Sequence, residues 1–359
     1  MKSSIPRPRG ALCLALATAV AAIAASPAQA TFPGGPGQLA FDSFDPAGVR
    51  DVGVYTVSPD GIATARVQAP ARKPQWSPSG RRILYTLDAG GNSGFWSAAP
   101  DGTEIRQEIA PAVGEQLEGA AWGPDGRTFV VRVTRRVATL QKSERAAVTS
   151  SLYVKRVDEG RRHRLWRGPE VGDPTWSPDG RLIAFVTRRR IAVIRPDGSR
   201  FRLLSAPQYV RWLDFSPDGR LLAFTEGAGR ATAIRVMDIA TRRTTTVVRA
   251  DAMARPGAAT WSPDGTELAF VWVEDGSASG AGPAWRETIH TIRPDGTGRR
   301  QRFELPPYSF VLTGLSWQAI PRVGFLAPPA APWPATPRPP GGAGPSATRP
   351  PWAPSVISR

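Results

Sequence analysis

The sequence predicts an all-β fold, a six-bladed β-propeller in which one blade is closed by strands from both termini. Three observations predict it: a recurring aromatic-plus-turn motif, a hydrophobic strand after each copy, and half-blades at the two ends of the chain. The motif aromatics lie 39 to 56 residues apart. Units of four short strands at such spacings are typical of propeller blades, and no amphipathic helical run competes with the strand pattern.

The motif joins an aromatic residue to a tight turn. Its five full copies are Trp76-Ser77-Pro78-Ser79-Gly80, Trp122-Gly123-Pro124-Asp125-Gly126, Trp176-Ser177-Pro178-Asp179-Gly180, Phe215-Ser216-Pro217-Asp218-Gly219 and Trp261-Ser262-Pro263-Asp264-Gly265. Proline at the second turn position presets φ and glycine at the fourth tolerates positive φ, as in a type I turn followed by a bulge. Turn geometry therefore accounts for the repeated aspartates without a catalytic role. The aromatic residue is expected to pack between neighbouring blades.

Each copy is followed by the rest of a four-stranded unit. A hydrophobic second strand such as Ile183-Ala184-Phe185 comes first, and a third strand leads into a second turn such as Pro196-Asp197-Gly198. A fourth strand such as Arg202-Leu203-Leu204 completes the blade. Because the two turns of a blade follow its first and third strands, both must lie on one face of the ring, which we call the turn face.

The chain ends supply the sixth blade. Residues 38–68 read as second, third and fourth strands around the turn Ser58-Pro59-Asp60-Gly61, and their first strand is missing. Residues 313–318 read as a first strand with nothing after it, and they contain Leu315-Ser316-Trp317 in place of the motif. Pairing these two segments closes the ring and removes an exposed sheet edge.

These repeats resemble those of the TolB-type propeller, a WD-like family of bacterial exported proteins, and they also occur in the propeller domains of prolyl oligopeptidase-type enzymes. The resemblance covers about residues 39–318 and implies the propeller fold. The N-terminal α/β domain of TolB has no counterpart in this sequence, and there is no room for a peptidase domain. The role of TolB itself is therefore not implied.

Composition divides the chain into three parts. Residues 1–30 read as a signal peptide, with three basic residues before an apolar run and Ala28-Gln29-Ala30 before the cleavage site. Residues 31–327 form the propeller, and 328–359 form a Pro-rich tail expected to be disordered. We expect an exported protein, periplasmic, envelope-bound or secreted, with no membrane span after cleavage. A retained N-terminal anchor is the alternative.

Charge and cysteine content exclude several functions. The net charge is +16, but almost all the cations are arginine, which indicates genome composition more than a nucleic-acid site. Attraction to anionic envelope polymers is expected to be weak. The one cysteine, Cys13, lies in the signal peptide, so the mature chain has no disulfide and no thiolate site. His163 and His290 have no second ligand at metal spacing. We expect no metal, no cofactor and a monomer.

The face opposite the turns, which we call the linking face, is the expected binding face. It carries the links between blades and the loops between second and third strands, and these loops vary in length: Arg135–Ser150 and Glu274–Arg286 are the long ones. Binding residues concentrate on variable loops held by a rigid scaffold. The predicted site at the channel mouth and on this face comprises Arg72, Lys73, Trp96, Glu118, Asp173, Arg211, Trp212 and Trp285.

Two functions remain open. The favoured one is a non-catalytic scaffold that binds an envelope or extracellular protein or peptide through the linking face. The alternative is a propeller hydrolase or lyase acting on a carbohydrate or peptide at the channel mouth, with Asp173 and either Glu118 or Asp214 as its carboxylates. No nucleophile elbow, P-loop or dinucleotide fingerprint supports the enzyme.

Overall fold

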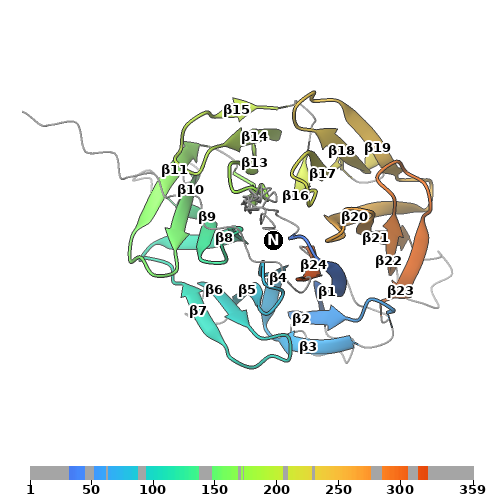
Figure 1. Cartoon of the computed structure of the whole chain (residues 1–359), viewed down its shortest axis with the longest axis horizontal. Helices are drawn as coiled ribbons and strands as arrows, with labels where there is room; N and C mark the ends of the chain where they lie inside the picture. Colours follow the sequence, from blue (N-terminus) through green and yellow to red (C-terminus); the bar gives the residue numbers. More distant parts are fainter. Residues whose placement is uncertain are drawn as a thin grey trace, which may run out of the picture.

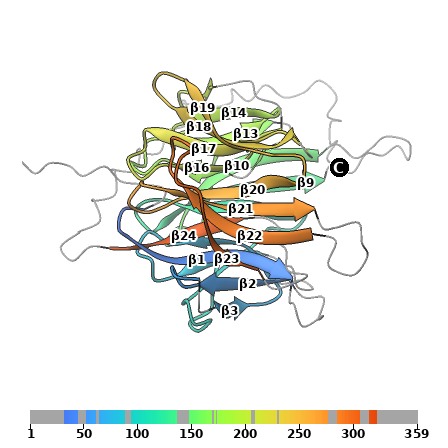
Figure 2. The same cartoon turned by 90° about the vertical axis from the view of Figure 1, so that its right-hand side faces the viewer.

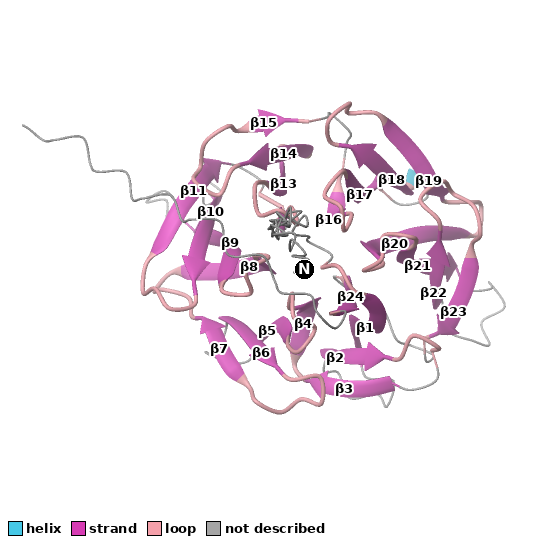
Figure 3. Cartoon of the chain, in the orientation of Figure 1, coloured by secondary structure: helices cyan, strands magenta, loops and turns pink. Residues whose placement is uncertain are grey.

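The computed structural model of the chain shows six four-stranded antiparallel sheets arranged around a central axis (Figure 1). The structure describes residues 32–321 except for 45–51, 62–63, 88–93, 137–147, 169–170, 173, 205–208, 229–230, 276–284 and 306–313. Almost all of the regular structure in this part is strand (Figure 3). The described residues include no helix that is long and apolar enough to cross a membrane.

Blades 1 to 5 each take four consecutive strands. Blade 1 is β4 (Ala71–Trp76), β5 (Ile83–Leu87), β6 (Gly94–Ala98) and β7 (Arg106–Ile109). Blade 2 is β8 (Glu115–Trp122), β9 (Thr128–Arg136), β10 (Val148–Arg156) and β11 (Arg162–Gly168). Blade 3 is β12 (Thr175–Trp176), β13 (Ile183–Thr187), β14 (Arg190–Ile194) and β15 (Arg202–Leu203). Blade 4 is β16 (Arg211–Phe215), β17 (Leu221–Glu226), β18 (Ala233–Asp238) and β19 (Thr244–Arg249). Blade 5 is β20 (Ala254–Trp261), β21 (Leu268–Asp275), β22 (Trp285–Ile292) and β23 (Arg300–Glu304).

Blade 6 is shared between the two ends of the described chain, as predicted. Its strand order is β24–β1–β2–β3, with β24 at Leu315–Ile320, β1 at Gly35–Phe44, β2 at Val52–Val57 and β3 at Thr64–Gln68. The pair Leu39 and Trp317 sets the register between β1 and β24. This pairing confirms both the six-bladed ring and its closure.

The core lies between blades. Six clusters of buried apolar side chains each lie mainly between two adjacent blades, one cluster for each blade interface. The motif aromatic belongs to such a cluster in every blade: Trp76 is 2% exposed and packs with Ala40 and Val54 of blade 6. The predicted position of the aromatic residues between blades is therefore confirmed. Each blade is stabilised by its neighbours, because a single sheet cannot cover its own apolar face.

The repeated turn is held by its serine and aspartate. In blade 4 the Ser216 hydroxyl donates to Asp218 Oδ1 at 2.6 Å and accepts from the Leu221 N–H at 2.9 Å. Asp218 Oδ1 also accepts from the Arg220 N–H at 3.0 Å, and the Gly219 N–H donates to the Ser216 carbonyl at 2.8 Å. These are the bonds of a type I turn with a following bulge. The structural role assigned to the repeated aspartates is confirmed here.

Replacing the turn glycine of blade 4 should destabilise the protein. Gly219 has φ +69°, and a Cβ there would lie 3.4 Å from Pro178 Cδ. Gly219→Ala should lower the free energy of unfolding by about 1–2 kcal/mol, the cost of left-handed backbone for an L-residue. Gly160→Ala is the control, because Gly160 lies in open space without a left-handed φ. Equal effects of the two substitutions in urea unfolding would contradict this account.

The turns form a closed collar on the turn face. In blades 2 to 5 the glycine of the turn lies against the proline of the preceding turn, as Gly180 does against Pro124. Blade 6 has no such turn after β24, and residues 33–34 occupy its place. The Gly34 N–H donates to the Pro263 carbonyl at 3.4 Å, and a Cβ on Gly34 would lie only 2.3 Å from the Ile320 carbonyl oxygen. The N-terminal segment thus fills the gap in the collar.

Candidate functional site

The central channel is lined by the innermost strands. One shared lining position lies three residues before the motif aromatic, or before Trp317 in blade 6. At this position the described residues are Lys73, Gly119, Trp212, Ala258 and Gly314. The sequence predicted Lys73 and Trp212 at this mouth, and the structure brings both into the channel lining. Asp173 is the blade 3 counterpart and lies outside the described residues.

The inner strands carry bulges where they reach the channel. The ladder register skips from Arg72 to Gln75 in blade 1 and from Arg211 to Asp214 in blade 4. Within these skips Lys73 has φ +56° and Trp212 has φ +51°, left-handed conformations that are uncommon for residues other than glycine. Such strain persists only where surrounding structure fixes it, and it clusters at functional sites. The bulges aim these two side chains at the channel.

A belt of polar side chains connects the blades inside the channel. In three blades the residue just before the aromatic accepts from the backbone N–H of the next blade's aromatic. Gln75 Oε1 accepts from Trp122 at 2.9 Å, Asp214 Oδ2 from Trp261 at 2.9 Å, and Ser316 Oγ from Trp76 at 3.0 Å. These N–H groups lie on strand edges that face the channel and have no strand beside them, so the belt satisfies them.

The belt predicts a structural role for Asp214. Its Oδ2 also accepts from the Thr260 hydroxyl at 2.9 Å. Asp214→Ala should lower the free energy of unfolding by about 2–4 kcal/mol, because two buried donors lose their acceptor. Asp214→Asn keeps one oxygen and should cost less than about 1 kcal/mol. Urea unfolding of both variants checks this, and an unchanged midpoint for the alanine variant would show that the belt does not stabilise the ring.

Charged groups at the mouth of the channel are tied to each other. The Lys73 ammonium donates to the Glu118 carbonyl oxygen, and the Lys73 N–H donates to Asp42 Oδ2 at 3.2 Å. The carboxylate of Glu118 pairs with Arg132. Blades 6, 1 and 2 are therefore cross-linked at the linking face, and the charges there have defined positions.

On the other side of the mouth, Arg211 and Trp212 lie together. Arg211 is exposed at the start of β16, with its guanidinium carbon 5.7 Å from the centre of the Trp212 ring. Trp212 lines the channel and also a second cavity, between blades 4 and 5, that includes Arg255 and Glu287. Of the predicted residues, Lys73 and Trp212 thus line the channel, Glu118 contacts Lys73, and Arg211 lies beside Trp212.

The remaining predicted site residues lie elsewhere or are not described. Arg72 is exposed in β4, where its carbonyl oxygen accepts from the Thr86 hydroxyl at 3.2 Å. Trp96 was expected on a loop, but it lies within β6 opposite Tyr85 and packs against the blade 6–blade 1 cluster. Trp285 is the first residue of β22, and its side chain lies outside the described part. The predicted long loops fall largely in 137–147 and 276–284, which are also outside it.

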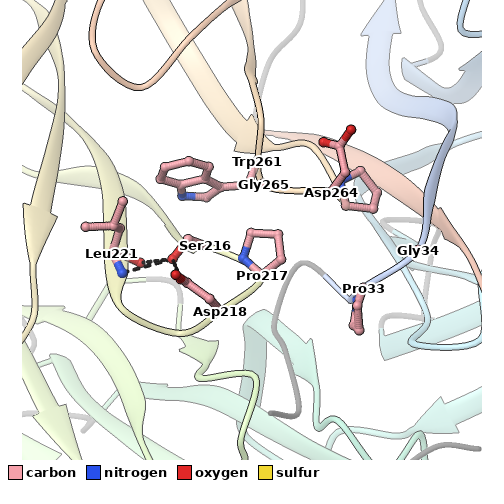
Figure 4. Close-up of a pocket in the computed structure, with 10 residues that line it drawn as sticks. Pro33, Gly34, Ser216, Pro217, Asp218, Leu221, Trp261, Asp264 and Gly265 are labelled. Atoms are coloured by element: carbon pink, nitrogen blue, oxygen red, sulfur yellow. Dashed lines mark hydrogen bonds between the residues drawn. The ribbon is translucent and has the colours of Figure 1, made fainter. Parts of the chain in front are cut away.

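The N-terminal segment separates the channel from a second opening at the turn face. Phe32 is 7% exposed, lines the channel and packs against the blade 1–blade 2 cluster. Pro33 and Gly34 line a cavity of about 420 Å³ on the turn face, together with Ser216, Pro217 and Trp261 among others (Figure 4). The hydroxyl and carboxylate there are used in the turn bonds described above. The channel cavity is therefore bounded on this side by residues 32–34.

A buried histidine cluster was not predicted. His290, 8% exposed, accepts at Nδ1 from Arg299 Nε at 3.1 Å and contacts Thr288 Oγ1 through Nε2 at 2.8 Å. The Arg299 guanidinium carbon lies 3.9 Å from the Trp272 ring centre. Burial first, and the charge of Arg299 second, lower the pKa of His290 to about 4. Among the described residues no group of three or more His, Cys, Asp or Glu side chains is placed to hold a metal.

Comparisons with known proteins agree on the fold. No protein-family model matches the sequence. No curated protein matches it either. TolB from Acinetobacter baumannii has a TM-score of 0.62 at 16% identity, over 79% of this chain and 67% of that one. A chain of the nidogen/laminin complex has a TM-score of 0.57 at 13% identity, over 80% of this chain and 100% of that one.

Enzymes share the architecture as well. Acylaminoacyl peptidase from Pyrococcus horikoshii has a TM-score of 0.50 at 11% identity, over 75% of this chain and 45% of the peptidase. This chain therefore spans less than half of that enzyme, and the likeness at such identities concerns the scaffold alone. Together with the six closed blades, these comparisons show that the chain has the fold of a six-bladed β-propeller, similar to that of TolB.

Proposed function

We propose that this chain is an exported, non-catalytic propeller that binds an envelope or extracellular protein or peptide through its linking face. The observation that supports the proposal is the channel lining, where Lys73 contacts Glu118 and Trp212 lies beside Arg211. An aromatic ring among charges of both signs, on a rigid ring, suits recognition of a peptide more than of an apolar ligand. In this proposal the first thirty residues are removed and the monomer acts alone.

The contacts of the carboxylates support binding over catalysis. Glycoside cleavage requires two carboxylates that face one substrate. Glu118 is paired with Arg132, and Asp214 Oδ2 accepts two hydrogen bonds within the interblade belt. The carboxylates of Glu118 and Asp214 therefore both take part in contacts that hold the channel wall together. The comparisons include an interacting propeller and a propeller-bearing peptidase, and they favour neither class.

Affinity capture from an envelope extract tests the proposal. The mature protein would be compared with a variant in which the loops Arg135–Ser150 and Glu274–Arg286 are replaced by short turns. A protein recovered by the intact form and lost by the variant is expected, provided that both forms unfold cooperatively. A third form, Arg181→Gln, changes the turn face and should recover the same protein as the intact form. Recovery that survives the loop replacement would overturn the face assignment.

A further inference from the structure

A groove opens from the channel mouth between blades 4 and 5, and we call it the 4/5 groove. Its cavity measures about 230 Å³. Its walls include Arg211 and Trp212 from β16, Arg255, Gly257 and Ala258 from β20, and Glu287 from β22. Trp212 and Ala258 also line the central channel, so the groove and the channel form one continuous depression.

The two walls each contribute an arginine. Arg211 begins β16 and Arg255 is the second residue of β20, so the guanidinium groups belong to opposite blades of the groove. The Thr225 hydroxyl of blade 4 donates to the Gly257 carbonyl of blade 5 at 2.8 Å and holds the walls together. Glu287, 8% exposed, is the single carboxylate among the described lining residues. The described lining thus contains two arginines and one carboxylate, and Arg211 is exposed.

The shape of the groove suits an extended chain. The groove continues into the channel, so a segment longer than the groove can run from one into the other. Trp212, held at φ +51°, presents an aromatic face at the junction with the channel.

We propose that the 4/5 groove binds an extended acidic peptide segment, with Arg211 and Arg255 binding its carboxylates and Trp212 contacting its backbone or side chains. Arginine binds carboxylates through two parallel N–H bonds, which fixes orientation as well as charge. This inference rests on the proposed function and specifies the chemistry of the partner: a segment rich in Asp or Glu, in place of a basic or apolar one.

The probe is fluorescein-labelled hexaglutamate, and its binding to the mature protein is measured by fluorescence anisotropy. The salt concentration is about 0.1 M, at which exposed charges are partly screened. Hexaglutamine and hexalysine are the charge controls, and an oligogalacturonate of the same length is the carboxylate control that lacks a peptide backbone. The groove variant is Arg211→Gln with Arg255→Gln. The matched variant is Arg188→Gln with Arg190→Gln, which removes the same charge from exposed positions at the β13–β14 turn.

Binding of hexaglutamate is expected, with a Kd at least tenfold weaker for the groove variant and changed less than twofold for the matched variant. Hexaglutamine and hexalysine should not compete. Equal weakening in the two variants would assign the binding to net charge and overturn the proposal, as would absence of hexaglutamate binding. If the oligogalacturonate binds in the groove and hexaglutamate does not, the ligand is an acidic sugar and the peptide proposal is overturned.

The groove and the proposed function fail in different ways. If hexaglutamate binding depends on the groove but no partner is captured from the envelope extract, the proposal for the groove is supported and the proposed protein-binding function is rejected. If the groove variant captures the partner as well as the parent does, and hexaglutamate does not bind, the proposal for the groove is rejected and the proposed protein-binding function stands. Circular dichroism and urea unfolding of each variant must match the parent, so that loss of binding is not loss of fold.

Discussion

Deletion of β24 should abolish cooperative folding. Removing the chain after Gly314 takes away Trp317, which is 8% exposed between blades 5 and 6, and the Ser316 acceptor for the Trp76 N–H. It also exposes the edge of β1. Loss of a buried tryptophan side chain alone costs about 3–5 kcal/mol, a large part of the 5–15 kcal/mol by which domains are stable. We expect no unfolding transition in urea and increased aggregation through the open edge.

Two further variants separate ring closure from simple truncation. A chain that ends at Pro321 keeps β24 and should unfold at the same urea concentration as the parent. In a circular permutant, Ile320 is joined to Gly35 through Ser-Pro-Asp-Gly and the chain is opened between Gly160 and Arg161. It should fold, because Gly35 and Ile320 are already partners in the ladder. Cooperative unfolding of the chain that ends at Gly314 would contradict the shared blade.

Acidification should destabilise the protein through His290. Its pKa is about 4 in the folded protein, against about 6.5 when unfolded. The unfolded chain therefore binds more protons between these values. The stability associated with the neutral imidazole is complete above about pH 6.5 and is lost as the pH falls toward 4. The shift corresponds to at most about 3 kcal/mol over the whole window.

The free energy of unfolding between pH 5.0 and 6.5 isolates this effect, because most carboxylates titrate at lower pH. His290→Gln should flatten the pH dependence in this range. The cause is local: Arg299 donates to His290 Nδ1, and a second proton would have to take that position. A slope that persists in His290→Gln would assign the pH dependence to other groups.

The fold could be predicted because its signals are local. The residues of a five-residue turn such as Ser216–Arg220 determine the hydrogen bonds of that turn. Each copy of the turn therefore marks where the strands on either side of it begin and end. The split blade followed from the pattern at the two ends. Boundaries were less accurate: the first strand of blade 6 was expected at 313–318 and lies at Leu315–Ile320. The fourth strand of blade 3, expected at Arg202-Leu203-Leu204, covers only Arg202–Leu203.

The site was predicted only in part, because its contacts join residues far apart in sequence. Lys73 and Trp212 were found from their place before the motif, but the left-handed bulges that aim them were not. The hydrogen bond from the Trp122 N–H to Gln75 joins residues 47 positions apart, and the sequence near either residue does not predict it. A polar residue before most motif aromatics was the available signal for the belt. Trp96 was expected on a loop, but it lies inside the third strand of blade 1 (Gly94–Ala98).

Photo-crosslinking tests the central claim, that the linking face is the binding face, most directly. A benzophenone side chain would be placed at Arg211 on the linking face or at Arg181 beside a turn on the opposite face, in the protein as produced by its own cells. Both positions are exposed. We predict a discrete adduct from position 211 that is absent from position 181. An adduct formed at 181, with none at 211, would contradict the account and move the binding site to the turn face.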